Sequence, residues 1–230
     1  MNLGDLAYPD VEALVDAVVL LPLGATEPHG PHAPLATDTV ISEGICRRAA
    51  EQLRGEIPVL VLPALPYGVT RYGGAFPGTV SISEATLRAL VTEVCERFER
   101  VVLVNSHFEP EQVETLRGLG LPLLDLTRRQ QAERLTEEFR SGSCHAGRYE
   151  TSLVLADRPE LVNRERMAAL EAKIVDMPGE IAAGKTDFLA LGMDRAYCGS
   201  PAEATAEEGE QTFETLADML VELVREVARA

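Results

Sequence analysis

Short uninterrupted runs of apolar residues alternate along this chain with longer segments whose apolar residues recur at helical spacing. Such runs fit strands buried on both faces of a sheet, because these strands have no polar face to show to water. We expect strands at residues 18–24, 59–65, 101–105 and 121–126. We expect helices at residues 37–53, 83–100, 109–116, 128–139, 168–175 and 202–229, with a further helix beginning in residues 150–156. This alternation predicts an α/β fold, in which a mostly parallel sheet carries helices on both faces.

The length and charge of the chain narrow the classes of function. Its 230 residues are enough to bury a substantial core, and they fit one domain spanning residues 1–230. The net charge is -16, from 21 basic and 37 acidic residues. A surface this acidic repels phosphate groups, so we expect neither nucleic acid nor an anionic membrane as a partner.

The cysteines and the apolar runs point to a cytoplasmic protein. Cys46, Cys95, Cys144 and Cys198 form no CxxC pair, and we expect them to be reduced thiols. The first residues lack the basic and apolar regions of a signal peptide. The longest apolar runs are too short to cross a bilayer.

All four histidines lie in three short stretches that also carry carboxylates, namely residues 27–38, 107–109 and 145–150. The first two stretches follow the predicted strands at 18–24 and 101–105. Because the carboxyl ends of parallel strands meet at one edge of a sheet, we expect these side chains to share a site. Residues two apart in extended backbone point the same way, so Glu27 can face one pocket with His29, and His107 with Glu109.

Imidazoles mixed with carboxylates are the ligands of Zn, Mn or Fe. Glu27, His29, Asp38, His107 and Glu109 together would offset most of the charge of two divalent ions. A pair of ions about 3.5–4 Å apart would hold a hydroxide and stabilise both the attacking and the leaving atoms of a hydrolysis. Asp38 is expected at a helix start, where it can bridge the two ions or act as the helix N-cap.

Three other patterns allow alternatives. The glycine-rich residues 67–79 fit either a wall that approaches a small ligand closely or a set of tight turns. The Cys144–His145 pair suggests a thiol nucleophile, but neighbours in sequence rarely form the hydrogen bond that this chemistry needs. Residues 179–186 match the P-loop pattern GxxxxGK[ST], but the preceding segment reads as a helix where a P-loop needs a buried strand.

Four segments, taken in order, resemble the motifs of the creatininase (creatinine amidohydrolase) family. They are LPLGATEPHGPH with LATD at residues 21–38, FPGT at 76–79, VNSHFE at 104–109 and HAGRYETS at 145–152. The resemblance spans about residues 18–163. It implies a three-layer α/β/α sandwich and a hydrolase with two divalent metal ions that cleaves the C–N bond of a small, non-peptide or cyclic amide.

The resemblance also implies roles for the individual residues. Glu27 and His107 would bind one metal, His29 and Glu109 the other, and Asp38 would bridge them. His145 would donate a proton or polarise the substrate carbonyl, and Glu150 would orient the site. Members of the family resemble one another in forming hexamers, so a homo-oligomer is expected.

Departures from the family pattern bear on the substrate. Creatininases proper enclose creatinine with tryptophans, and this chain has none. The acidic residue that precedes the histidine in their third metal-site motif is Cys144 here. Creatinine is therefore not the expected substrate. A formylamide deformylase, a peptidase of the mycofactocin type and a non-catalytic binding protein on the same scaffold are the alternatives.

Overall fold

The computed structural model describes residues 1–12, 14 and 16–230 of the chain, and its centre is a four-stranded parallel sheet. The strands are β1 (Val18–Leu23), β2 (Val59–Val61), β3 (Val101–Asn105) and β4 (Leu123–Leu124), in the order β2-β1-β3-β4. All three pairings are parallel. β1 and β3 are therefore the central neighbours, and their carboxyl ends lie side by side.

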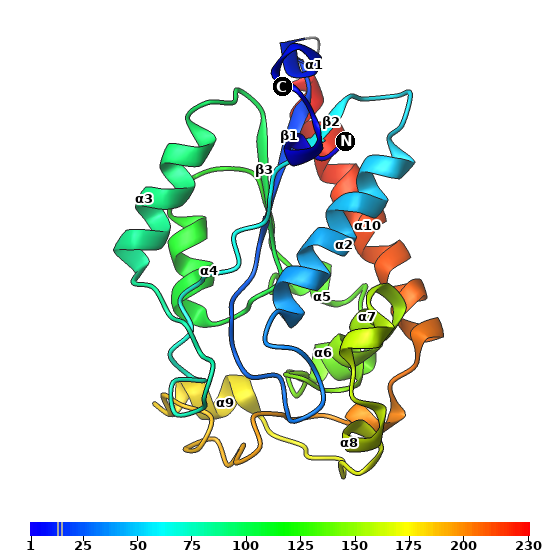
Figure 1. The fold of residues 1–230 in the computed structure, drawn as a ribbon. Helices are drawn as coiled ribbons and strands as arrows, with labels where there is room; N and C mark the ends of the chain where they lie inside the picture. Colours follow the sequence, from blue (N-terminus) through cyan, green and yellow to red (C-terminus); the bar gives the residue numbers. More distant parts are fainter. Residues whose placement is uncertain (13, 15) are drawn as a thin grey trace.

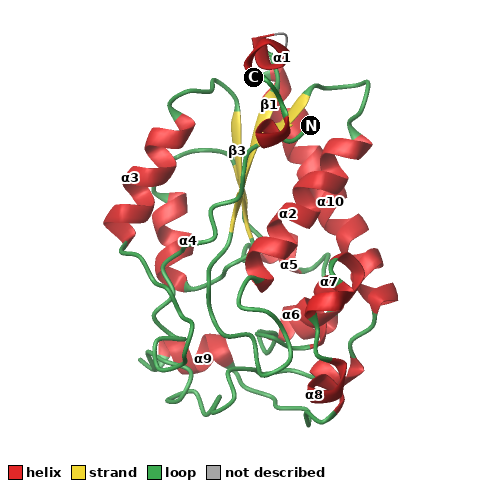
Figure 2. Ribbon diagram, viewed as in Figure 1, coloured by secondary structure: helices red, strands yellow, loops and turns green. Residues whose placement is uncertain are grey.

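Helices cover both faces of this sheet, as Figures 1 and 2 show. One face packs against α2 (Thr37–Gln52), α7 (Arg148–Asp157) and α10 (Ala206–Arg229); the other packs against α3 (Glu84–Cys95) and α4 (Pro110–Arg117). Side chains of β1 alternate between the two cores, with Val18 and Leu20 on the first and Val19 and Leu21 on the second. This arrangement confirms the predicted α/β/α sandwich.

The remaining elements are short and lie mostly beyond the carboxyl edge of the sheet. They include α5 (Arg129–Ala132), α6 (Glu137–Ser141), α8 (Arg164–Ala168) and α9 (Met177–Ala182). The others are α1 (Tyr8–Glu12) and the 3-10 turns η1 (Leu3–Asp5), η2 (Pro159–Leu161) and η3 (Pro201–Glu203). Among the described residues, no helix combines the length and apolar character needed to cross a membrane.

Several predicted elements are shorter than expected, or are absent. β2 ends at Val61, although residues 62–65 stay beside β1 through the Leu65–Pro22 backbone hydrogen bond of 3.0 Å. The helix predicted at 128–139 is two short helices, because Thr136 caps α6 by accepting from the Phe139 amide. The helix predicted at 168–175 is wrong, since Lys173 forms an antiparallel bridge with Gly199 instead.

The C-terminal helix α10 lies across α2 and α7, the two helices that begin near the carboxyl edge of the sheet. It packs against α7 and α2, and its N-cap Thr205 accepts from the Glu208 amide. Gly209 lies directly against the backbone of α7, where a Cβ would overlap the carbonyl oxygen of Ser152. Only glycine permits this approach of the two helices.

Candidate metal centre

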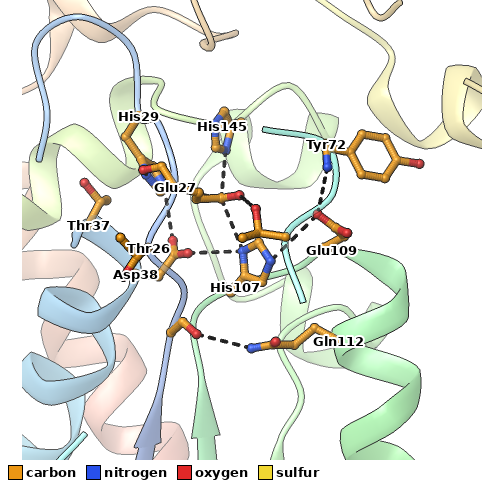
Figure 3. Close-up of polar contacts among 12 residues, drawn as sticks. Thr26, Glu27, His29, Thr37, Asp38, Tyr72, His107, Glu109, Gln112 and His145 are labelled. Atoms are coloured by element: carbon orange, nitrogen blue, oxygen red, sulfur yellow. Dashed lines mark hydrogen bonds and ion pairs between the residues drawn. The ribbon is translucent and has the colours of Figure 1, made fainter. Parts of the chain in front are cut away.

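Six acidic and imidazole side chains converge beyond the carboxyl ends of β1 and β3. Figure 3 shows Glu27, His29, Asp38, His107 and His145 of this cluster. The backbone after β1 supplies two of them, the first turn of α2 one, the segment after β3 one, the loop before α7 one and the first turn of α7 the last. All six are buried; they are Glu27, His29, Asp38, His107, His145 and Glu150. The edge of the sheet on which the sequence placed the site is thus the edge where these groups meet.

Asp38 lies at the centre of this cluster and faces both imidazoles that follow the strands. Its Oδ1 is 3.1 Å from His29 Nε2, and its Oδ2 is 3.1 Å from His107 Nδ1. Glu27 Oε1 is 3.2 Å from the same His107 nitrogen, and Glu150 Oε2 is 3.6 Å from His29 Nε2. Two groups of three ligand atoms therefore share Asp38: Glu27–Asp38–His107 and His29–Asp38–Glu150. A third group joins Glu27, His29 and His145.

Asp38 does not cap its helix. The N-cap of α2 is Ala36, which makes no side-chain cap bond, and Asp38 lies one residue inside the first helical position. Its carboxylate is 1% exposed and points into the cluster. Of the two roles that the sequence left open, the geometry supports the bridging carboxylate.

Each imidazole is held by a backbone carbonyl through the nitrogen that faces away from the cluster. His29 Nδ1 lies 3.2 Å from the Glu27 carbonyl oxygen, His107 Nε2 lies 2.8 Å from that of Val69, and His145 Nε2 lies 3.0 Å from that of Pro28. A carbonyl only accepts, so these nitrogens carry the proton when the ring is neutral. The lone pair of the other nitrogen then faces the carboxylates, as in metal-ligating histidines.

In the absence of a cation, the charges within the cluster strongly shift the pKa values of its side chains. Burial opposes protonation of His29, but Asp38, Glu150 and Glu27 outweigh it and raise its pKa to about 10. Burial likewise opposes protonation of His107, yet Glu27 and Asp38 raise its pKa well above the ordinary value. Burial raises the pKa of Glu150 to about 8 despite the nearby His29. Protons therefore supply the positive charge that balances these carboxylates.

The donor set fits a divalent cation. His29 Nε2 and Asp38 Oδ2 are both buried and have no hydrogen-bond partner, although each lies within about 3 Å of an oppositely charged group. Nitrogen and oxygen donors of this kind suit Zn or Mn. Buried polar atoms without partners are costly, and a bound ion would satisfy both.

Glu109 is placed differently from the other predicted ligands. Its carboxylate accepts the backbone amides of Arg71 at 2.8 and 2.9 Å and of Tyr72 at 3.2 Å. Burial raises its pKa to about 7. Its nearest imidazole atom is His107 Nε2 at 4.0 Å, the nitrogen that is bonded to Val69. Glu109 belongs to none of the three groups formed by the described residues, and it anchors the loop that follows β2.

Two residues that the sequence did not single out hold this loop and Glu27 in place. Thr70 donates a hydrogen bond from its hydroxyl to Glu27 Oε2. Gln112, fully buried on α4, accepts the Val69 amide at 2.8 Å and donates to Asn105 Oδ1 at 2.9 Å. Of the two interpretations of the glycine-rich loop, a wall close to the site agrees with this position. A lone threonine and a lone glutamine carry no sequence signal for such a role.

A cavity of about 390 Å³ opens onto the cluster. Its lining combines the carboxylates with apolar side chains, among them Phe108, Phe139, Met177, Ile181 and Phe188. The Phe188 ring lies 4.4 Å from the ring of His145. A cavity of this size and character suits a small molecule or a short segment of chain.

The two competing motifs are not supported by the structure. Cys144 lines the cavity, but burial raises the pKa of its thiol well above the ordinary value, so it is not an activated thiolate. The P-loop match begins within α9, whose N-terminus is capped by Asp176 through the Gly179 amide, and the element directly before α9 is the helix α8 rather than a strand.

A parallel α/β sandwich with buried imidazoles and carboxylates at its carboxyl edge defines a class of enzyme that binds a divalent metal. The family profile described as Creatininase, Creatinine amidohydrolase, matches residues 4–224. The chain belongs to this creatininase family of hydrolases.

Three similar proteins illustrate the breadth of the family. A mycofactocin precursor peptide peptidase of Mycobacterium ulcerans (strain Agy99) is 33% identical over 227 residues, covering 92% of this chain and 84% of that protein. A crystal structure of creatinine amidohydrolase (creatininase) is 28% identical with a TM-score of 0.78, covering 98% and 96% of the two chains. A structure named Creatininase Mn is 27% identical with a TM-score of 0.71, covering 98% and 97%.

Proposed function

We propose that this protein is a dinuclear metal-dependent hydrolase that cleaves an amide C–N bond. Glu27, Asp38 and His107 would hold one divalent ion, and His29, Asp38 and Glu150 the other. The observation that carries the proposal is the shared position of Asp38, whose two oxygens each lie 3.1 Å from a different imidazole. A carboxylate with one oxygen toward each ligand group is what a bridge between two ions requires.

This ligand set differs from the one implied by the family resemblance. The resemblance pairs His29 with Glu109, and it gives Glu150 an orienting role. The distances favour Glu150 as the ligand beside His29, at 3.6 Å, with Glu109 holding the loop next to His107. Both assignments remain predictions, and a test that separates them is described in the Discussion.

The protein's own groups can perform the rest of the chemistry. Two divalent ions, when bound, would polarise the amide carbonyl and make a water molecule a better nucleophile. The apolar walls of the cavity exclude bulk water from this reaction and strengthen the electrostatic interactions within it. Glu27 is held for its role by Thr70, and His107 by the Val69 carbonyl.

His145 is the group best placed to transfer protons. Burial, with the charge of His29, lowers its pKa to about 4, so the ring is neutral near pH 7. Because Nε2–H is bonded to Pro28, Nδ1 presents a lone pair to the site, 3.9 Å from Glu27 Oε1. His145 would first accept a proton from the attacking water at Nδ1 and then return it to the leaving nitrogen.

Two kinds of amide remain candidate substrates. The creatinine amidohydrolase relatives favour a small cyclic amide, and the peptidase relatives favour a peptide bond. A cavity of about 390 Å³ without a tryptophan in the chain fits the second kind better than a slot for one flat ring. Divalent Zn, Mn or Fe, a cytoplasmic location and a homo-oligomer complete the proposal.

Metal content and hydrolysis test this proposal together. Purified protein, loaded with Mn or Zn and freed of excess ion, should contain about two equivalents per chain by elemental analysis. A panel of cyclic ureides, formamides and short peptides should then show hydrolysis that a chelator abolishes and added ion restores. Fewer than one equivalent of metal at saturation, or hydrolysis that is indifferent to the chelator, would contradict it.

A further inference from the structure

Arg140 is an unpaired cation at the cavity. It lies in the last turn of α6, is exposed, and is the only lysine or arginine among the described residues that line the cavity. In the described part of the chain its guanidinium has neither an ion-pair nor a hydrogen-bond partner. By contrast, Arg134, three residues before α6 begins, is paired with Glu222 at 2.7 Å.

When two metal ions are bound, no negative charge in the cavity lining remains to balance the positive charge of Arg140. Four carboxyl groups line the cavity, those of Glu27, Asp38, Glu109 and Glu150. Two divalent ions would offset all four of them when ionised. The positive charge of Arg140 is then the remaining net charge of the lining, and it favours an anionic group on whatever binds there.

The wall beside Arg140 is apolar. Phe139, its neighbour on α6, stands edge-on to Phe108 with ring centroids 5.6 Å apart, and Met177 and Ile181 of α9 line the same cavity. A guanidinium beside such a surface recognises a planar carboxylate through paired N–H donors. The ligand that matches both features carries a carboxylate close to an apolar side chain.

We propose that the substrate is an amide that bears a free carboxylate, which Arg140 binds while an apolar side chain lies against Phe108, Phe139 and Ile181. N-acylated apolar amino acids and the C-terminal end of a short peptide share this chemistry. The inference rests on the proposed function, because the charge balance assumes two bound ions. It assigns Arg140 as the residue that selects the anionic amide over its neutral counterpart.

A binding experiment isolates the contribution of Arg140. Metal-loaded full-length protein is titrated calorimetrically with N-acetyl-leucine and with N-acetyl-leucinamide, which differ only in the carboxylate. Wild type should bind the acid about tenfold more tightly than the amide, since a charge-assisted hydrogen bond is worth about that much. Arg140→Gln should reduce this preference to less than about twofold by weakening only the acid.

Matched variants and a second probe separate the explanations. Arg97→Gln removes the same charge from an exposed arginine outside the cavity lining, and it should keep the preference for the acid. Arg140→Lys should keep part of it. An acid preference that survives in Arg140→Gln would mean that the carboxylate binds the ions instead, and would overturn the proposal.

Failure of this inference is distinguishable from failure of the proposed function. Equal binding of the two probes, or no binding of either at millimolar concentration, would overturn the role of Arg140 even if the metal-loaded protein hydrolyses amides. Conversely, a protein that binds two ions and prefers the acid through Arg140, yet hydrolyses no peptide and no N-acylated amino acid, would overturn the hydrolysis of such amides and leave Arg140 as the residue that binds the carboxylate.

Discussion

His107 Nε2 lies 2.8 Å from the carbonyl oxygen of Val69, which fixes the ring with Nδ1 toward Asp38 and Glu27. The amide of the same Val69 donates to Gln112 Oε1, also at 2.8 Å. One loop residue thus joins a candidate metal ligand to a buried side chain of α4. Partners of this kind set the tautomer and direction of a ligating imidazole.

Gln112→Leu should therefore weaken the metal position on the His107 side. The change leaves the Val69 amide and Asn105 Oδ1 without a partner, so we expect a loss of about 1–3 kcal/mol in the free energy of unfolding. Metal affinity at that position should fall about 10- to 100-fold. Chelator competition measures the affinity and urea unfolding the stability. Gln211→Leu, an exposed position on α10, serves as the control, and equal affinities in the two variants would refute the connection.

Glu150→Gln and Glu109→Gln distinguish the two ligand sets. If Glu150 is the ligand beside His29, its amide variant should retain only one of two equivalents of metal at saturation. Glu109→Gln should retain both, with the affinity of one reduced about tenfold because the loop at residues 71–72 loses its anchor. Elemental analysis across a metal titration gives the answer. The reverse outcome would restore the pairing of His29 with Glu109.

His145→Ala should keep the metal and lose turnover. The ring contributes a proton-transfer atom rather than one of the two groups that share Asp38, so both equivalents should remain. The value of kcat should fall about 10²- to 10⁴-fold, the usual contribution of general acid–base catalysis. Loss of one equivalent would instead identify His145 as a ligand through its group with Glu27 and His29.

Metal binding should release protons and should tighten as the pH rises. In the metal-free protein the pKa of His29 is about 10 and that of His107 is raised, so both rings are protonated at neutral pH. Each must lose its proton to bind an ion, so affinity should increase between about pH 6 and pH 9. Calorimetry in two buffers of different ionisation enthalpy counts the protons. Affinity that falls with rising pH would contradict these protonation states.

The position of the site could be predicted because it depends on strand order and strand ends. Apolar runs identified β1 and β3, and parallel strands present their carboxyl ends at one edge. The expectation that residues two apart in extended backbone point the same way also holds for the pair that follows β1. Glu27 and His29 both reach the cluster, with Glu27 Oε1 and His29 Nε2 3.9 Å apart.

His107 and Glu109 also line one cavity, as the spacing predicted, but Glu109 stays outside the three ligand groups of the described residues. Glu109 is the N-cap residue of α4, and Pro110 begins the helix immediately after it. Its carboxylate accepts the amides of Arg71 and Tyr72, and it lies 4.0 Å from the His107 nitrogen that is bonded to Val69. Glu150 reaches His29 because α7 packs against both α2 and α10, a tertiary contact that local patterns do not encode.

The predicted helix boundaries were wrong where local capping or tertiary pairing overrides the helical spacing of apolar residues. The hydroxyl of Thr136 accepts the Phe139 amide and starts a new helix inside a continuous amphipathic pattern. Val175 packs with Phe188 and Met193 in a separate apolar cluster, which pulls residues 169–175 out of helical geometry. Arg140 and Gln112 were not found because neither stands in a recognisable motif.

The close approach of Gly209 to Ser152 holds α10 against the second turn of α7, two residues after Glu150. α10 contributes no side chain to the candidate metal centre, yet its contact with α7 helps to fix the position of Glu150. Even a methyl group at position 209 would overlap the Ser152 carbonyl and force α10 and α7 apart, and α7 is the helix that carries Glu150. Residues close to the C-terminus thus help to position a carboxylate of the candidate metal centre.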